Sequence, residues 1–273
     1  MNRDPVFAAG APTPGVGHVD VVRHDGGQAI VRADVVIDEQ PVALVYNGLS
    51  HVVMMATPLD LEDFALGFSL SEGLLNSVDE VRDLTVQPGA MGTTVQLEVS
   101  PRAFSRFKDR RRHLAGRTGC GLCGVDSLQA FHDALPASSV TQRSGALPGP
   151  VAVARAFAAL PALQPLQART GGCHAAAWSN PQGEIQLVRE DVGRHNALDK
   201  LIGALVRQGE ALPEGFALVS SRASHEMVSK CMRLGVGTLA AISAPTSLGV
   251  DLARRGGLQL FGFCRNDVAV QYA

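Results

Sequence analysis

Residues 217–234 read ALVSSRASHEMVSKCMRL, a short apolar run followed by a small polar turn and a helical segment. The same order of runs occurs on both sides of this stretch, so strand-like and helical segments alternate over the last hundred residues. Such alternation predicts a mainly parallel sheet covered by helices. The expected strands are 185–188, 217–219, 239–242 and 258–263, and the expected helices are 196–207, 224–234 and 247–255.

Small or charged residues follow each of the four expected strands. In open α/β sheets, ligands gather at the carboxyl ends of the strands. Several of these groups also stand where a helix begins and backbone N–H groups point outward. This end of the sheet is therefore suited to a polar, phosphorylated ligand, although ordinary loop and capping chemistry explains such residues equally well. The groups are residues 190–191, 220–222, 243–246 and 264–265.

The first hundred residues predict a small β-rich unit instead. Asn47-Gly48 joins two apolar runs and predicts a tight hairpin turn. Thr57-Pro58 offers the start of a helix, and Ser100-Pro101 starts a second helix that is strongly basic. We expect strands at 29–37, 41–46, 51–55, 84–87 and 94–99, helices at 57–75, 100–116 and 125–135, and a connector at 137–149.

These patterns divide the chain into three expected parts. Residues 1–17 form a disordered Pro/Gly/Ala-rich tail, 18–145 an N-terminal β-rich domain with the basic helix and a cysteine loop, and 146–273 an α/β domain. The fold class is thus α+β for the whole chain and α/β for its second half. A net charge of −2 and the lack of a long apolar run argue against a nucleic-acid coat or a membrane protein, so we expect a cytoplasmic location.

The loop Thr118-Gly119-Cys120-Gly121-Leu122-Cys123-Gly124 carries the most distinctive chemistry. Its glycines suit a mobile thiol that reaches two partners in turn. The basic residues just before it favour thiolate over thiol, and the thiolate is the reactive form. An unremarkable exposed loop beside a solvated basic helix is the plain alternative. The basic residues are Arg102, Arg106, Lys108, Arg110, Arg111, Arg112 and Arg117.

Zinc is the main chemical rival for these sulfurs. Cys120, Cys123, Cys173 and His174 include enough soft ligands for a tetrahedral site. The second pair is adjacent in sequence, however, which fits a standard structural zinc site poorly. We therefore expect no permanently bound metal. Cys231 lies inside an expected helix and reads as a packed small hydrophobe, whereas the role of Cys173 is open.

The turn at 189–200, REDVGRHNALDK, combines seven ionisable residues at the end of a strand. Such a density indicates a binding or acid/base site. The plain alternative is that Asp191 caps the helix and the other charges pair in water. His174 and His195 are the best candidates for proton transfer near neutral pH.

Taken together, these motifs resemble the FdhD family of formate dehydrogenase accessory sulfurtransferases. The similarity runs from about residue 20 to the C-terminus, through several independent motifs in the expected order. They are 41–48 (PVALVYNG), 118–124 (TGCGLCG), 172–178 (GCHAAAW), 190–200 (EDVGRHNALDK), 219–224 (VSSRAS) and 262–264 (GFC).

The resemblance implies a function and a set of site residues. Family members accept sulfur as a persulfide from a cysteine desulfurase and pass it to the molybdenum of the bis(molybdopterin guanine dinucleotide) cofactor, which then enters formate dehydrogenase. The persulfide would sit on Cys120, and Cys123 is the second candidate catalytic residue. The cofactor-binding segment would be Phe263, Cys264, Arg265, Asn266, Asp267 and Val268.

The resemblance also implies a cytidine-deaminase-like three-layer fold for the second domain and a homodimer. The chain has no His-x-Glu and no Pro-Cys-x-x-Cys, so the deaminase fold is expected without deaminase chemistry. Two other functions are kept as alternatives. One is a non-catalytic molybdenum-cofactor chaperone, and the other is a structural zinc-binding protein.

Overall fold

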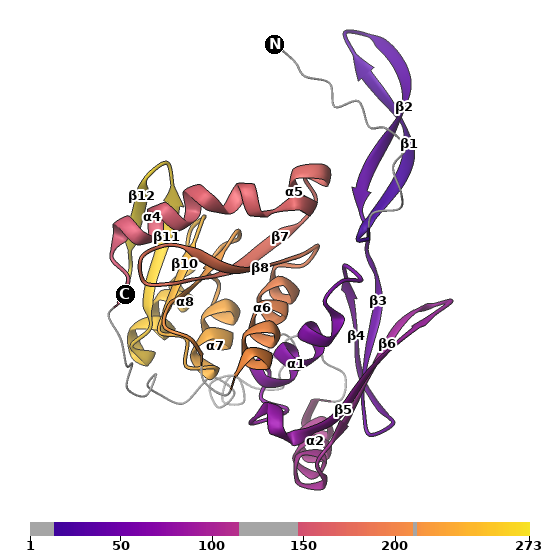
Figure 1. Cartoon of the computed structure of the whole chain (residues 1–273), viewed down its shortest axis with the longest axis vertical. Helices are drawn as coiled ribbons and strands as arrows, with labels where there is room; N and C mark the ends of the chain where they lie inside the picture. The colour runs from indigo at the N-terminus through magenta and orange to yellow at the C-terminus, as the bar shows by residue number, and fades with distance from the viewer. Residues whose placement is uncertain (1–13, 115–146, 210–211) are drawn as a thin grey trace.

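The computed structural model describes residues 14–114, 147–209 and 212–273, with the side chains of 110–114 excepted. These residues form three sheets, and Figure 1 shows them as a projecting arm, a small β-rich unit and a larger α/β unit. The expected helix at 125–135 and most of the connector at 137–149 lie outside the described residues. The described part contains no helix long and apolar enough to span a membrane.

The arm is a two-stranded antiparallel hairpin of β1 (Val16–Asp25) and β2 (Gln28–Ile37). Gly26 and Gly27 both have positive φ and make its turn, a conformation that glycine adopts without strain. Strand β2 was predicted at 29–37, but β1 was not. The expected tail boundary at residue 17 was also too late, since the chain is already in β1 at Val16.

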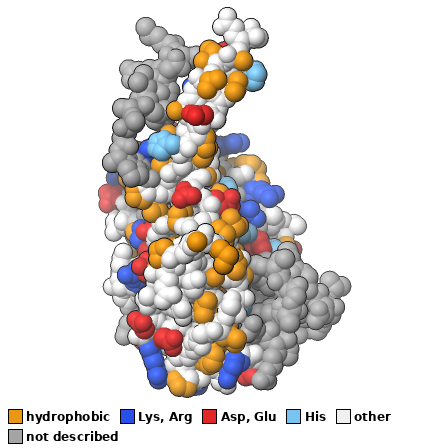
Figure 2. Space-filling model, turned by 90° about the vertical axis from the view of Figure 1, so that its right-hand side faces the viewer, with side chains coloured by type: hydrophobic (Ala, Val, Ile, Leu, Met, Phe, Trp, Pro, Cys, Tyr) orange, Lys and Arg blue, Asp and Glu red, His pale blue; other side chains and the backbone are white. Residues whose placement is uncertain are grey.

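The arm extends away from the rest of the molecule, and both of its faces are largely exposed (Figure 1). Figure 2 shows hydrophobic side chains on its surface. The most exposed are Val22, Ile30 and Val31, at 53%, 51% and 73%. An isolated hairpin of this kind is only marginally stable in water, so these side chains form a surface without a partner in the described structure.

The N-terminal unit is a four-stranded sheet in the order β4-β3-β6-β5. The Asn47-Gly48 turn joins the first two strands as expected, with both residues at positive φ. The first helix begins and ends inside the predicted range, because Gly73 turns the chain at positive φ. The elements are β3 (Gln40–Tyr46), β4 (Leu49–Ala56), α1 (Leu61–Ser71), η1 (Val78–Glu80), β5 (Val81–Gly89), β6 (Gly92–Val99) and α2 (Pro101–Leu114).

The C-terminal unit is a six-stranded sheet in the order β12-β11-β10-β9-β7-β8. Strands β9, β10 and β11 are parallel, as expected, whereas β7 and β12 run antiparallel to their neighbours. Strands β7 (His174–Ser179) and β12 (Val268–Gln271) were not predicted. The remaining strands are β8 (Ile185–Asp191), β9 (Phe216–Val219), β10 (Thr238–Ala241) and β11 (Gln259–Arg265).

Helices cover both faces of this sheet. One core joins α6, α7 and α8 to the side chains of one face, including Trp178 and Leu239. A second core joins α4 to the other face, including Phe216 and Phe261. The expected three-layer, cytidine-deaminase-like arrangement is therefore present. Its helices are α4 (Pro150–Ala159), η2 (Leu160–Leu163), α5 (Pro165–Thr170), α6 (Arg194–Gln208), α7 (His225–Arg233) and α8 (Ser247–Gly256).

The two units meet where α1 crosses α6, and they meet backbone to backbone. A Cβ added at Gly67 of α1 would overlap the carbonyl oxygen of Asp199, and one added at Gly203 of α6 would overlap that of Asp63. Glycine at both positions lets the helices approach more closely than side chains allow. This crossing brings the start of α1 against the turn between β8 and α6, and thereby next to the carboxyl ends of the strands.

Candidate functional site

The loops that follow the parallel strands lie side by side, as the sequence predicts. The N–H of Thr246, after β10, donates to the carbonyl of Ala223, after β9, at 3.0 Å. The N–H of Phe263, near the end of β11, donates to the carbonyl of Ser243 at 3.1 Å. We call this set of loops, residues 190–195, 220–226, 242–246 and 263–268, the strand-end rim. It is the candidate site within the described residues.

Asp191 and Lys200 form an ion pair beneath the rim that is fully shielded from solvent. Lys200 Nζ lies 2.7 Å from Asp191 Oδ2, and both side chains are 0% exposed. Thr57 of the other unit contacts both members of the pair, because its N–H donates to Asp191 and its carbonyl accepts from Lys200. Burying two charges is costly unless they are paired and fully hydrogen-bonded, which is the case here. The pair therefore anchors the N-terminal unit to the rim.

Asp191 also holds the turn itself in shape. Its Oδ1 accepts from the Gly193 N–H at 2.7 Å and from Asn196 Nδ2 at 3.0 Å. Gly193 is the N-cap of α6, and no side chain caps that helix. The expectation that Asp191 caps the helix while its neighbours pair in water is wrong, because α6 has no side-chain cap and Asp191 is fully buried in an ion pair with Lys200.

A second buried cluster joins α1 to α7 through Lys230. Its Nζ lies 2.9 Å from both oxygens of Asp199, 2.8 Å from Ser71 Oγ and 2.7 Å from Glu72 Oε1. Burial works against the ammonium form, but the carboxylates of Asp199 and Glu72 outweigh it and raise the pKa of Lys230. Lys230 is therefore a permanent cation at neutral pH and holds α1 against α6 and α7.

Arg189 completes the contacts between the units at the edge of the same interface. Its guanidinium donates to Asp63 Oδ2 at 2.8 Å, and Arg207 donates to Asp63 Oδ1 at 2.8 Å. Most charged residues of the 189–200 segment thus take part in the ion pairs and hydrogen bonds that hold one unit against the other. Only the residues of this turn that face outward therefore remain candidates for the predicted acid/base site.

A small group of titratable residues does face the rim. His195 Nε2 lies 3.1 Å from Glu226 Oε2, with side-chain exposures of 26% and 14%. His174 Nδ1 lies 3.5 Å from Ser220 Oγ. Burial lowers the pKa of His174, and the positive charges of Arg194 and His195 lower it further. The two predicted histidines are thus brought together as a neutral imidazole and an imidazole paired with a carboxylate, an arrangement that can hold and move a proton.

Cys173 is adjacent to this group but is not a nucleophile. Its thiol donates to Glu190 Oε1 at 3.4 Å. Burial and the negative charge of Glu190 raise its pKa to about 12. The thiol form is therefore favoured at neutral pH, which argues against a nucleophilic role for Cys173.

The other two described cysteines are packed in the interior. Cys231 is fully buried on α7, as the sequence predicts, and burial raises its pKa to about 12. Cys264 is also fully buried, with a pKa raised by burial to about 12. Thiolate chemistry at neutral pH is therefore disfavoured at all three described cysteines.

The expected cofactor segment 263–268 forms the tip of the hairpin between β11 and β12. Asn266 and Asp267 have positive φ and make a two-residue turn, and Phe263 has positive φ at an irregularity in the pairing. The side chains of this segment are exposed with the exception of Cys264. Cys264 therefore contributes packing, whereas the other five residues are presented to solvent at the rim.

The principal predicted thiols, Cys120 and Cys123, lie outside the described residues. So do Arg117 and the side chains of Arg110, Arg111 and Arg112. On the visible part of the basic helix, Arg106 is bound to Glu80 at 2.6 Å and Lys108 lies over the ring of Phe104. In the part of the chain that the structure describes, no group of three or more His, Cys, Asp or Glu side chains is arranged to hold a metal.

Sequence reasoning missed the partners that lie far away in the chain. No local motif links Thr57, Asp63, Lys230 or Glu226 to the 189–200 segment, yet each contacts a residue of it. The only sequence signal that could have found them is the excess of charge in that segment. Such a charge excess requires partners somewhere if the segment is buried.

Comparison with known proteins gives a consistent result over nearly the whole chain. Residues 37–273 match the model of the FdhD/NarQ family. A Sulfur carrier protein FdhD from Cupriavidus necator is 51% identical over 98% of this chain and 92% of its own length. The protein of the same name from Chromobacterium violaceum is 50% identical over 94% of this chain and 95% of its own length.

A solved structure shares the fold. It is described as a formate dehydrogenase accessory protein from Desulfotalea psychrophila and superposes with a TM-score of 0.70. The match covers 94% of this chain and 96% of the other, at 24% sequence identity. At that identity the likeness supports the fold alone.

Proposed function

This chain belongs to the FdhD/NarQ family, and on that premise we propose that it is a sulfur carrier serving formate dehydrogenase. It takes sulfur as a persulfide from a cysteine desulfurase and transfers it to the bis(molybdopterin guanine dinucleotide) cofactor. The cofactor is a bound substrate here, and it passes to formate dehydrogenase afterwards. The protein is a persulfide-mediated sulfurtransferase in this scheme.

The structural observation that supports the proposal concerns the ionisation of the cysteines. A sulfur carrier needs a thiol that ionises readily and is accessible, and three of the five cysteines fail this test. Cys173, Cys231 and Cys264 have pKa values raised to about 12. Cys120 and Cys123 remain as the candidates, and a positive field from nearby arginines favours the thiolate.

The first step is a thiol–persulfide exchange at Cys120. Its thiolate attacks the outer sulfur of the donor persulfide, a new S–S bond forms, and the S–S bond of the donor breaks. The donor cysteine leaves as a thiolate and takes up a proton. Cys120 then carries the persulfide, and Cys123 is the second thiol of the same site.

The strand-end rim is the proposed place for the cofactor. Phosphates suit the exposed Arg222, the half-buried hydroxyl of Ser243 and the backbone N–H groups where α7 and α8 begin. The exposed tip side chains Phe263, Arg265, Asn266, Asp267 and Val268 are proposed to contact it. His195, held by Glu226, is the proposed proton donor and acceptor at this rim.

The partners in this scheme are a cysteine desulfurase, formate dehydrogenase and a second copy of this chain. The projecting arm supports the proposed homodimer, since its exposed valines and isoleucine gain from being covered. We propose a cytoplasmic location, where thiols stay reduced, and neither nucleic acid nor a membrane as a partner.

The decisive experiment follows labelled sulfur. The protein is incubated with a cysteine desulfurase and [35S]cysteine, and the label bound as persulfide is counted without reductant. We expect label on the unmodified protein and on Cys173→Ser, and at least a tenfold loss in Cys120→Ala, a deficit large enough to exclude partial labelling of a secondary thiol. Label that survives in Cys120→Ala and disappears in Cys123→Ala would move the persulfide to Cys123.

The alternatives give different results in the same set of variants. A non-catalytic cofactor chaperone predicts that Cys120→Ala supports full formate dehydrogenase activity in cell extracts. A structural zinc protein predicts about one zinc per chain by elemental analysis, lost when Cys120 and Cys123 are both replaced. In the described structure the thiol of Cys173, one of the four candidate ligands, donates to Glu190.

A further inference from the structure

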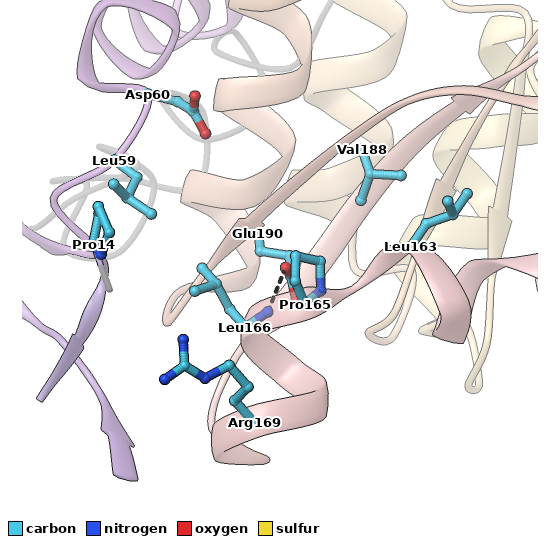
Figure 3. Close-up of a pocket in the computed structure, with 9 residues that line it drawn as sticks. All are labelled: Pro14, Leu59, Asp60, Leu163, Pro165, Leu166, Arg169, Val188 and Glu190. Atoms are coloured by element: carbon cyan, nitrogen blue, oxygen red, sulfur yellow. Dashed lines mark hydrogen bonds between the residues drawn. The ribbon is translucent and has the colours of Figure 1, made fainter. Parts of the chain in front are cut away.

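A pocket of about 360 Å³ opens on the side of the α/β unit that faces the base of the arm (Figure 3). Pro14, Leu59 and Asp60 come from the N-terminal segment, and the other lining residues come from η2, α5 and β8. It lies on the segment around Glu190 but away from the tip at 263–268. Its volume is at the small end of the roughly 300–1,000 Å³ typical of ligand pockets, so a cofactor of two joined dinucleotides does not fit.

Most of the pocket wall is apolar. Leu59, Leu163, Leu166 and Val188 line it together with two prolines. Such a surface favours an aliphatic group, because burying it removes apolar area from water.

The two acids on the wall already have partners within the protein. Glu190 accepts from the N–H groups of Leu166 and Gln167 at 2.9 and 2.8 Å, and the thiol of Cys173 donates to it as well. Figure 3 shows its carboxylate turned toward the Leu166 nitrogen. Asp60 lies 3.6 Å from Arg189, within a group of two aspartates and two arginines whose charges balance. Neither acid is therefore available to a cationic ligand.

Arg169 is different from both acids. Across the described residues it has no hydrogen bond or ion pair, although it is half-buried on the last turn of α5. In Figure 3 its guanidinium extends from α5 toward the side of the pocket formed by Pro14 and Leu59. A guanidinium offers five N–H donors in a planar fork that matches a carboxylate.

We propose that this pocket binds a small amphipathic carboxylate, with its aliphatic part against Leu59, Leu163 and Val188 and its carboxylate on Arg169. None of the tip residues 263–268 lines this pocket. The proposal does not depend on the sulfur-carrier function, and the two can fail independently.

The test uses three probes of equal chain length: hexanoate, 1-hexanol and hexylammonium. Binding to the full-length protein is measured by saturation-transfer NMR and by calorimetric titration. We expect hexanoate to bind with a dissociation constant on the order of 1 mM, since so few atoms support only weak binding. Hexanol should bind about tenfold more weakly, because it lacks the charge that pairs with Arg169. Absence of hexanoate binding, or hexylammonium binding as tightly, would overturn the proposal.

Variants locate the site and separate the contribution of Arg169 from that of the apolar wall. Arg169→Gln should reduce hexanoate binding to the level of hexanol and leave hexanol unchanged, whereas Arg169→Lys should retain part of the difference. Leu163→Trp fills the pocket from an exposed position and should abolish the binding of both probes. Arg255→Gln, an exposed arginine on α8, is the matched control and should change neither. Unchanged hexanoate binding in either Arg169→Gln or Leu163→Trp contradicts the assignment.

Labelled-sulfur transfer serves as the separate readout. Arg169→Gln should carry as much label as the unmodified protein. Loss of hexanoate binding with normal labelling supports a distinct site, and loss of labelling would mean that Arg169 belongs to the sulfur-transfer machinery instead.

Discussion

The turn between β8 and α6 and the tip between β11 and β12 lie at the same end of the six-stranded sheet, yet their side chains have opposite surroundings. In the turn, Asp191 and Lys200 are completely buried, and both carboxylate oxygens and the ammonium nitrogen have partners. At the tip, Arg265, Asn266 and Asp267 are exposed. The turn faces the N-terminal unit, whereas the tip faces solvent.

Charged residues where a strand ends can therefore serve either the stability of the fold or the binding of a ligand. Where such a junction is covered by another part of the chain, its charged residues form buried pairs that stabilise the folded protein. A junction left open is available to a ligand, and its charges contribute little to stability. The two regions can therefore be distinguished by what a single substitution does to folding and to binding.

The largest effect is expected from Lys200→Met. It leaves Asp191 as a buried carboxylate without its cation, so we expect a loss of about 3–5 kcal/mol in the free energy of unfolding. Urea denaturation followed by circular dichroism measures it. Arg155→Met, which breaks an exposed pair with Glu184, is the control and should cost less than about 1 kcal/mol. If both variants lose equal stability, the buried pair is not the anchor.

The second effect concerns the close crossing of α1 and α6. Gly203→Ala places a methyl group against the Asp63 carbonyl oxygen and forces the helices apart, at a cost of about 1–3 kcal/mol. Gly149→Ala is the control, since a Cβ there meets nothing within 4 Å. Thermal unfolding of both variants compares the two sites. A stabilised Gly203→Ala variant, as helix propensity alone would give, would refute the backbone contact.

These interfaces show where the sequence stops being informative. The period of the apolar runs predicted the three parallel strands and their helices, and Asn47-Gly48 predicted its hairpin, because these signals are local. Strand β7 was missed because its alanines carry no β-branched signal, and β12 because it is a short edge strand. The partners of Asp191 and Asp63 are set by how two units dock, more than a hundred residues apart in sequence.

A change at the tip should separate binding from folding. Arg265→Gln removes an exposed charge, so the free energy of unfolding should change by less than about 0.5 kcal/mol. Binding of the guanine dinucleotide cofactor, measured by equilibrium dialysis, should weaken about five- to tenfold because a phosphate partner is lost. Unchanged cofactor affinity in this variant would remove Arg265 from the proposed contact surface.

The smallest effect is expected in the pH dependence of stability, and it comes from the boundary between the two regions. Burial and the nearby positive charges lower the pKa of His174 in the folded protein, so the unfolded chain binds the proton more tightly. Its neutral form therefore favours folding fully above the unfolded pKa of about 6.5, and this contribution is lost as the pH falls below it.

His174→Gln cannot take up that proton, so between pH 7 and pH 5 its stability should fall less steeply than that of the unmodified protein. Urea midpoints measured across this range give both slopes. His24→Gln, on the exposed arm, is the control for replacing a histidine by glutamine. Equal slopes for His174→Gln and the unmodified protein would mean that the pKa of His174 does not differ between the folded and unfolded states, which would contradict its desolvation at the rim.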